Sequence, residues 1–302
     1  MTTMKRRTAL ATLATLATLA THALPLRAQP ARPLRVVASF SLLADMAREL
    51  AGDAAQVHSL VGANADAHVF EPTPADARRL AQADLVIVNG LHFEGWIDRL
   101  VRSSGYRGPV VVATRGITPR RMGVGFDPHA WQSLAHAQRY VENIRAALAA
   151  AAPAQAAAID ARAHAYAAQL AALDARARAA FGAIPRERRR VVTTHDAFGY
   201  LGEAYGIGFI APRRWSTASE ASAADVAAVI RELRRQRAQA LFVENISEPR
   251  SIERIAQETG ARIGGTLYSD ALALPGQGPD SYLKLMAHNI DTLLAALQRK
   301  PS

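Results

Sequence analysis

The 302-residue sequence contains no cysteine, which excludes disulfide bonds and thiolate metal sites. The same absence leaves no N-terminal cysteine for lipid attachment, so we expect a soluble mature chain. Aromatic residues are only 6% of the chain, and no basic segment is interleaved with them, so we expect no nucleic-acid partner. The longest apolar stretch, over residues 8–23, is short and rich in threonine, too weak for a permanent membrane span.

The first 28 positions contain no acidic residue. Their basic residues, Lys5, Arg6, Arg7 and Arg27, contribute four of the ten positive charges in the net charge of +10. This basic start, the Ala/Leu/Thr stretch and a small residue at Ala28 predict an export signal over residues 1–28. The surroundings of the paired arginines fit twin-arginine export poorly, so we expect the general route into a bacterial periplasm. Most of the remaining arginines are expected on solvated helix faces.

Strand-like apolar runs alternate with helical patterns along the chain, which predicts parallel sheets covered by helices. The expected strands are residues 34–40, 56–61, 84–89, 109–113, 191–194, 208–210, 240–244 and 262–267. The expected helices are residues 42–51, 93–101, 197–205, 221–235, 251–259 and 280–297, one opened by Thr73 and Pro74, and one from Trp131 to about Ala150.

A longer helical pattern, from Ala154 to Gly182, separates two halves of similar organisation. At about 1.5 Å per residue it spans on the order of 40 Å, more than one small sheet needs. We therefore predict an α/β fold of two lobes, each a small parallel sheet flanked by helices, joined by one long backbone helix. The expected parts are the signal peptide (1–28), the N-terminal lobe (29–153), the linking helix (154–184) and the C-terminal lobe (185–302).

Four potential ligands follow predicted strands or precede helices: His68, His129, His195 and Asp270. Three imidazoles and one carboxylate form a four-coordinate set that suits a tetrahedral first-row metal, zinc before the others, whereas manganese prefers more oxygen. Each residue also has an ordinary structural alternative, such as a helix cap. Sequence spacing alone does not place the four in one site.

Four segments around these residues resemble the metal-site signatures of one family, the zinc/manganese substrate-binding proteins of ABC importers (the TroA/ZnuA-like group). They are Asp66–Thr73 (DAHVFEPT), Asp127–Trp131 (DPHAW), Thr194–Tyr200 (THDAFGY) and Tyr268–Leu272 (YSDAL). Val243–Ser247 and His288–Thr292 fit the family as well, in the right order. The resemblance implies a metal buried between the lobes, with His68 and His129 from the first lobe and His195 and Asp270 from the second.

Two positions bear on the choice of metal within this resemblance. Manganese-type members tend to carry glutamate where this chain has His195, so the histidine points to zinc. Many zinc members have a long histidine-rich loop before the second motif, whereas Arg115–Gly125 is short, basic and without histidine. His92 follows a strand end, and we expect it at the rim of the site or behind a ligand rather than in the ligand set.

A ligating imidazole usually donates its second ring N–H to an acceptor. Glu244, at the end of a predicted strand, is our candidate for holding His195 or another ligand, with Glu71 and Asp196 as weaker candidates. The other histidines and the tryptophans are expected in packing or surface positions: His58, His136, His164, His288, Trp96, Trp131 and Trp215.

The predicted function is capture rather than catalysis: a periplasmic zinc-binding monomer that delivers the metal to an inner-membrane ABC permease, with loading by a periplasmic metallochaperone left open. Four protein ligands leave no position for an activated water, which argues against an enzyme. Three alternatives stand beside this prediction. They are a manganese-specific member of the same family, a periplasmic zinc hydrolase with Asp270 or Glu244 as base, and a receptor for an organic or chelated ligand.

Overall fold

The computed structural model describes residues 32–211, 223–236, 238, 240–247 and 249–299. The predicted export signal lies outside this part of the chain, as do Trp215 and the first two residues of the helix expected at residues 221–235. No helix in the described ranges has the length and apolar character needed to cross a bilayer.

The first lobe contains a four-stranded parallel sheet in the order β2-β1-β3-β4. Its strands are β1 (Leu34–Phe40), β2 (Ala55–Val61), β3 (Leu85–Val88) and β4 (Val110–Val112). The helices of this lobe are α1 (Ser41–Ala51), α2 (Pro74–Ala81), α3 (Ile97–Ser104) and α4 (Leu134–Ala151). The central strands β1 and β3 are buried on both faces, as expected for continuous apolar runs in a parallel sheet.

The second lobe repeats this plan with a sheet in the order β10-β9-β7-β8, again all parallel. Its strands are β7 (Arg190–Val192), β8 (Gly208–Ile210), β9 (Ala240–Glu244) and β10 (Ile263–Leu267). Its helices are α6 (Gly199–Tyr205), α7 (Ala223–Gln236), α8 (Arg250–Thr259) and α9 (Tyr282–Leu297). The prediction of two small parallel sheets flanked by helices is confirmed.

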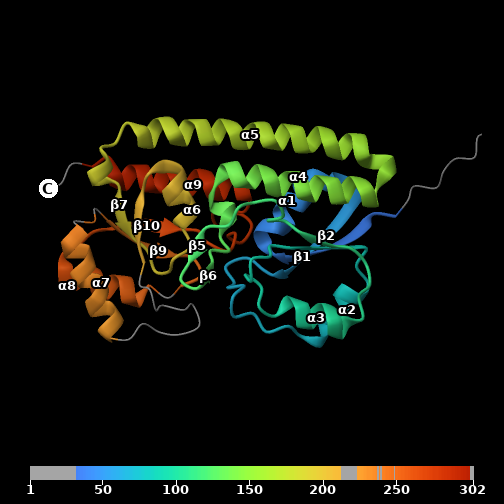
Figure 1. Cartoon of the computed structure of the whole chain (residues 1–302), viewed down its shortest axis with the longest axis horizontal. Coiled ribbons are helices and arrows are strands. Elements are labelled where there is room, and N and C mark those ends of the chain that lie inside the picture. Colours follow the sequence, from blue (N-terminus) through green and yellow to red (C-terminus); the bar gives the residue numbers. More distant parts are fainter. Residues whose placement is uncertain (1–31, 212–222, 237, 239, 248, 300–302) are drawn as a thin grey trace, which may run out of the picture. The chain divides into compact units, whose positions relative to one another are not determined.

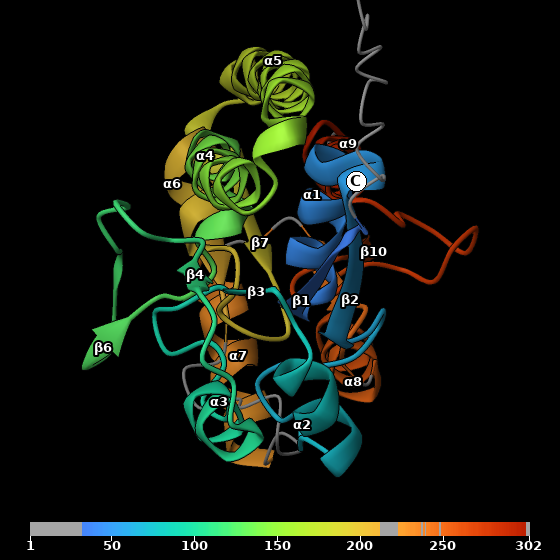
Figure 2. The same cartoon turned by 90° about the vertical axis from the view of Figure 1, so that its right-hand side faces the viewer.

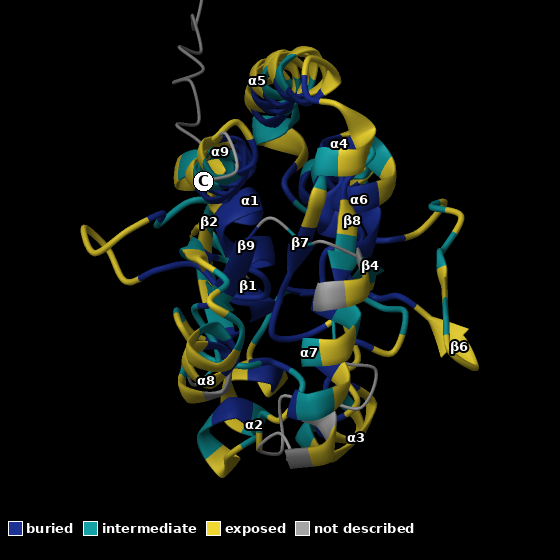
Figure 3. Cartoon of the chain, turned by 90° about the vertical axis from the view of Figure 1, so that its left-hand side faces the viewer, coloured by how far each residue is buried: buried dark blue, intermediate teal, exposed yellow. Residues whose placement is uncertain are grey.

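The long helix α5 (Ala156–Gly182, 27 residues) passes across both lobes (Figure 1). It packs on α4 and α1 of the first lobe and on α9 and α6 of the second. One stripe of the helix is buried, whereas its outer side is exposed (Figure 3). The buried residues recur at spacings of three, four and seven residues, which place them on one side of the helix: Ile159, Ala163, Tyr166, Leu170, Ala177 and Phe181. The joining helix, predicted at Ala154–Gly182, begins two residues later, at Ala156, after a short 3₁₀ turn.

Several helix boundaries follow from recognisable signals. Thr73 caps α2, because its Oγ1 accepts from Asp76 N while the Asp76 carboxylate accepts from Thr73 N. Pro74 lies in the first turn, as predicted. The predicted helix at residues 93–101 begins four residues too early. Leu91 and His92, with φ of 55° and 62°, turn the chain just before it. Residues 91–96 form a turn instead, and α3 begins at Ile97.

A small antiparallel hairpin, β5 (Arg121–Met122) and β6 (Gly125–Phe126), was not predicted. It lies within the basic segment between β4 and His129 and projects away from the sheet of the first lobe (Figure 2). Two-residue strands carry too little apolar alternation to be recognised from sequence.

Candidate metal centre

His68 lies in the loop between β2 and α2. Asp66 Oδ1 accepts the His68 backbone N–H at 2.8 Å and closes a tight turn around the histidine. Trp96 fixes the same loop by donating from Nε1 to Ala67 O at 2.8 Å. The His68 side chain is 26% exposed.

His129 follows β6 and precedes a short 3₁₀ turn. Asp127 holds it twice: Oδ1 accepts the backbone N–H of His129 at 3.0 Å and lies 2.7 Å from its ring Nδ1. This contact suits the tautomer in which Nδ1 carries the proton and Nε2 keeps its lone pair for the site. The His129 ring packs against Trp131, with ring centroids 5.2 Å apart.

His195 follows β7, at the carboxyl edge of the second sheet, where ligands of open α/β sheets usually lie. Glu244 ends the neighbouring strand β9 and accepts the His195 backbone N–H at 2.8 Å through Oε1. Its other oxygen lies 2.6 Å from His195 Nδ1. The prediction that Glu244 contacts a candidate ligand is therefore correct. Glu71 and Asp196 are both exposed.

Asp270 follows β10 in a loop that hydrogen bonds attach to the first lobe. Ser269 O accepts from Trp131 Nε1 at 2.9 Å and from Gln132 Nε2 at 2.8 Å. On the C-terminal side of Asp270, Leu272 N donates to Ser41 Oγ of the first lobe at 3.0 Å. This loop places a fully buried carboxylate between the two lobes.

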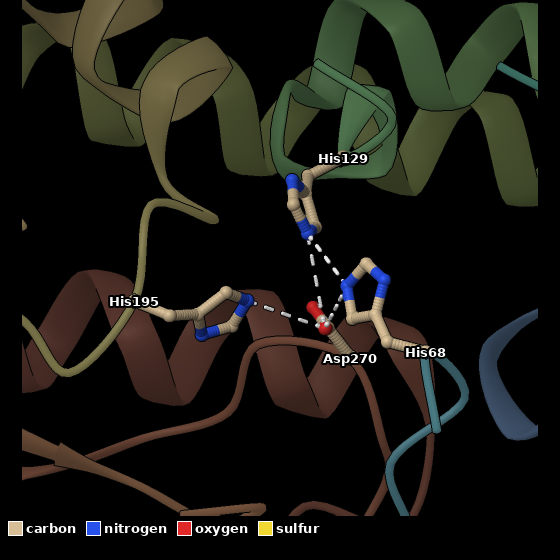
Figure 4. A group of neighbouring side chains, drawn as sticks. All are labelled: His68, His129, His195 and Asp270. Atoms are coloured by element: carbon tan, nitrogen blue, oxygen red, sulfur yellow. Dashed lines mark hydrogen bonds and ion pairs between the residues drawn. The ribbon is translucent and has the colours of Figure 1, made fainter. Parts of the chain in front are cut away.

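The structure brings the four predicted residues together: one ligand atom of each lies within 4.8 Å of the others (Figure 4). Asp270 Oδ2 lies 3.2, 3.8 and 3.4 Å from the Nε2 atoms of His68, His129 and His195. His68 Nε2 and His129 Nε2 are 3.3 Å apart. A tetrahedral zinc ion with bonds of about 2.0–2.1 Å requires ligand atoms roughly 3.3 Å apart. The four distances above are near this value, and the two remaining pairs, which lie within 4.8 Å, would close around the ion.

Both oxygens of Asp270 are buried, and neither has a hydrogen-bond partner with acceptable geometry in the described residues. A buried carboxylate without such partners is costly, because the water that would solvate it is lost. A cation enclosed by Asp270 and the three imidazoles would remove this cost. The donor set and the unsatisfied oxygens therefore fit a divalent metal.

The charges of the site are strongly coupled. Burial disfavours the charged form of His195, but Glu244 and Asp270 outweigh it and raise its pKa well above the usual value. Burial likewise opposes ionisation of Asp270, yet His129 and His195 lower its pKa below the usual range. Burial is also outweighed at Glu244, whose pKa His195 lowers. The carboxylates are therefore ionised at neutral pH, and a dication bound by the four residues would displace the proton held by His195.

Sequence reasoning missed the role of Asp127. The signal was present as a repeated Asp-x-His spacing, Asp66 to His68 and Asp127 to His129, in which each aspartate accepts the backbone N–H of its histidine. His92 is exposed and lies outside the four-residue group. Trp96 and Trp131 are buried, as predicted.

Comparison with protein families gives one matching model, ZnuA, described as zinc-uptake complex component A periplasmic, over residues 36–296. Among similar proteins, the zinc-binding protein TroA of Treponema pallidum is 33% identical over 281 residues, covering 90% of this chain and 91% of its own length. The manganese-binding lipoprotein MntA of Halalkalibacterium halodurans is 32% identical over 267 residues, covering 88% and 89%.

Solved structures give the same relationship. The periplasmic zinc-binding protein TroA from Treponema pallidum superposes with a TM-score of 0.83 at 31% identity, covering 88% of this chain and all of that one. A manganese-bound periplasmic metal-binding protein from Candidatus Liberibacter asiaticus gives a TM-score of 0.80 at 28% identity, covering 87% and 99%.

Proposed function

Since the chain belongs to the ZnuA family and is a periplasmic metal-binding protein of the ABC-transporter type, we propose that its cargo is Zn²⁺ held by His68, His129, His195 and Asp270. One observation carries this assignment. Three imidazole Nε2 atoms surround a buried carboxylate whose oxygens lack hydrogen-bond partners among the described residues.

Zinc is favoured over manganese by the chemistry of the donor set. Three nitrogens and one oxygen at tetrahedral spacing suit zinc, whereas manganese prefers more oxygen ligands. Manganese is the second candidate, because MntA, a manganese-binding protein by name, is about as similar to this chain as TroA, a zinc-binding protein by name.

The protein acts by capture and release. Four protein ligands fill a tetrahedral shell and leave no position for an activated water, so the site suits storage of an ion better than hydrolysis. The hydrolase alternative gains no support from the relatives, which by name include a manganese-binding lipoprotein and a metal ABC transporter substrate-binding lipoprotein. A receptor for an organic ligand would leave the converging histidines without a purpose.

Entry and exit of the ion involve His68. Its side chain is 26% exposed, whereas the side chains of His129 and His195 are 2% and 9% exposed and that of Asp270 is fully buried. The neighbouring Val69 is 44% exposed. We propose that the ion arrives past His68 and that docking on an inner-membrane ABC permease, from the periplasm, opens the site by moving the lobes apart. The 302 residues offer no cysteine for lipid attachment.

Metal analysis of protein purified without a histidine tag tests the proposal, followed by titration with Zn²⁺ and Mn²⁺ against a chromophoric chelator. We expect one zinc per chain and tighter binding of zinc than of manganese. His195→Ala should lower zinc affinity by orders of magnitude, whereas His164→Ala, at an exposed position of α5, should not change it. Equal affinities in these two variants contradict the ligand assignment. Tighter binding of manganese supports the second candidate.

A further inference from the structure

The base of the β5–β6 hairpin lies next to the metal centre. Arg120 O accepts from Asp127 N at 2.9 Å, one step below the cross-strand pair of Arg121 and Phe126. Arg120 and Asp127 therefore face each other where the hairpin joins the fold, while Val124 at the other end is fully exposed. Asp127 is two residues from His129.

The carboxylate of Asp127 is shared between a cation and a ligand. Its Oδ2 accepts from Arg120 Nη1 at 2.9 Å, and its Oδ1 lies 2.7 Å from His129 Nδ1. The Asp127 side chain is fully buried, and Arg120 is a cation that contacts it. Held between Arg120 and His129, the carboxylate fixes the orientation of the ring and aims Nε2 at the metal position.

Helix α6 of the second lobe holds Arg120 from the other side. Arg120 Nε donates to Glu203 Oε1 at 2.8 Å. The hydroxyl of Tyr200 accepts from Arg120 N at 2.9 Å and donates to Asp127 O at 3.0 Å. A Cβ on Gly199 would lie 2.2 Å from Arg120 Nη1, so this close approach requires glycine.

We propose that Arg120 is a positioning residue for the metal ion: it fixes the Asp127 carboxylate that orients His129, and its bond to Glu203 ties this orientation to the second lobe. The inference rests on the proposed function, because it assigns His129 as a ligand. Separation of α6 from the first lobe would loosen Arg120 and, through Asp127, the hold of His129 on the ion.

If Arg120 acted only through its charge, removing it would strengthen zinc binding rather than weaken it. A guanidinium near the site repels a dication, so its loss would strengthen binding by simple electrostatics. Loss of positioning weakens binding, and the sign separates the two explanations. Arg121 provides a matched control, because it has the same charge on the next residue but lies over the Phe126 ring at 5.4 Å.

The experiment compares Arg120→Gln with Arg121→Gln in the full-length mature chain. Zinc affinity is measured by competition with a chelator, the ligand geometry by the visible spectrum of the Co²⁺ form, and the fold by melting without metal. Arg120→Gln should weaken zinc binding about 10- to 100-fold and change the Co²⁺ spectrum, whereas Arg121→Gln should leave both unchanged. Wild-type or tighter zinc binding by Arg120→Gln overturns the proposal. Failure of the wild-type chain to bind zinc overturns the proposed function instead.

A second variant covers the case in which Arg120→Gln does not fold. Glu203→Gln changes a side chain that is 64% exposed and leaves the Arg120–Asp127 pair in place. We expect zinc binding weaker by about two- to fivefold, the range of an exposed ion pair. Ring ¹⁵N NMR of the metal-free protein should also show a larger share of the second His129 tautomer. Unchanged affinity and unchanged His129 signals in this variant overturn the link to Glu203.

Discussion

Replacement of Asp270 by asparagine tests the metal centre most severely, because it changes charge without changing shape. Asp270 supplies the only carboxylate in the four-residue group and is fully buried. A dication and a carboxylate oxygen about 2 Å apart attract by about 17 kcal/mol at an effective dielectric constant of 20. Dehydration offsets part of this attraction, so we expect a zinc affinity at least about 1000-fold lower, equivalent to about 4 kcal/mol.

Thermal unfolding with and without zinc gives a direct assay of this change. At zinc concentrations about 1000 times the dissociation constant, the wild-type protein should gain about 4 kcal/mol of stability. Asp270→Asn should lose this gain, whereas Asp291→Asn, on the exposed side of α9, should keep it. Without metal, Asp270→Asn should be less stable than wild type, because it removes a carboxylate that interacts favourably with the buried His195. A full zinc-induced shift in Asp270→Asn would refute the reasoning.

Three further predictions follow from the contacts around the site and the lobes. Glu244→Gln removes the charge beside His195 Nδ1, so zinc affinity should fall about 10- to 100-fold and the pKa of His195, measured by NMR, should decrease. Burial raises the pKa of Asp45 from 3.8 to about 6. The protonated carboxyl therefore contributes up to about 3 kcal/mol to the free energy of unfolding; this contribution is complete below pH 3.8 and is lost as the pH rises through about 6. Urea unfolding at a series of pH values measures it. Asp45→Asn should remove this pH dependence. Leu170→Ala leaves a cavity beneath α5 and should lower the free energy of unfolding by about 2–5 kcal/mol.

Each of these has a clear contrary outcome. Wild-type zinc affinity in Glu244→Gln would mean that His195 does not need its carboxylate partner. The same pH dependence of unfolding in Asp45→Asn and wild type would assign the slope to other groups. A cost under about 1 kcal/mol for Leu170→Ala would mean that α5 does not depend on its buried stripe.

The fold was predictable where the apolar pattern is long. The strands β1 and β9 are continuous apolar runs and α5 is a long uninterrupted helical pattern, and their expected bounds differ from the observed ones by at most two residues. The start of α3 and the β5–β6 hairpin were not predictable, because they depend on positive φ at His92 and on strands of two residues. No periodicity marks either feature.

The four converging residues could be proposed from sequence only through the family resemblance, since they come from loops far apart in the chain. Their mutual distances depend on the packing of both lobes against α5. The contact of Glu244 with His195 was anticipated from its place at a strand end. The contact of Arg120 with Asp127 and Glu203 was not, because it requires the hairpin and α6 to lie side by side.

X-ray absorption spectroscopy at the zinc edge tests the central claim most directly, using the purified protein loaded with one zinc per chain. The account predicts four nitrogen or oxygen neighbours at about 2.0 Å, with the multiple-scattering pattern of three imidazoles. A shell of five or six neighbours, or fewer than three imidazoles, would contradict it.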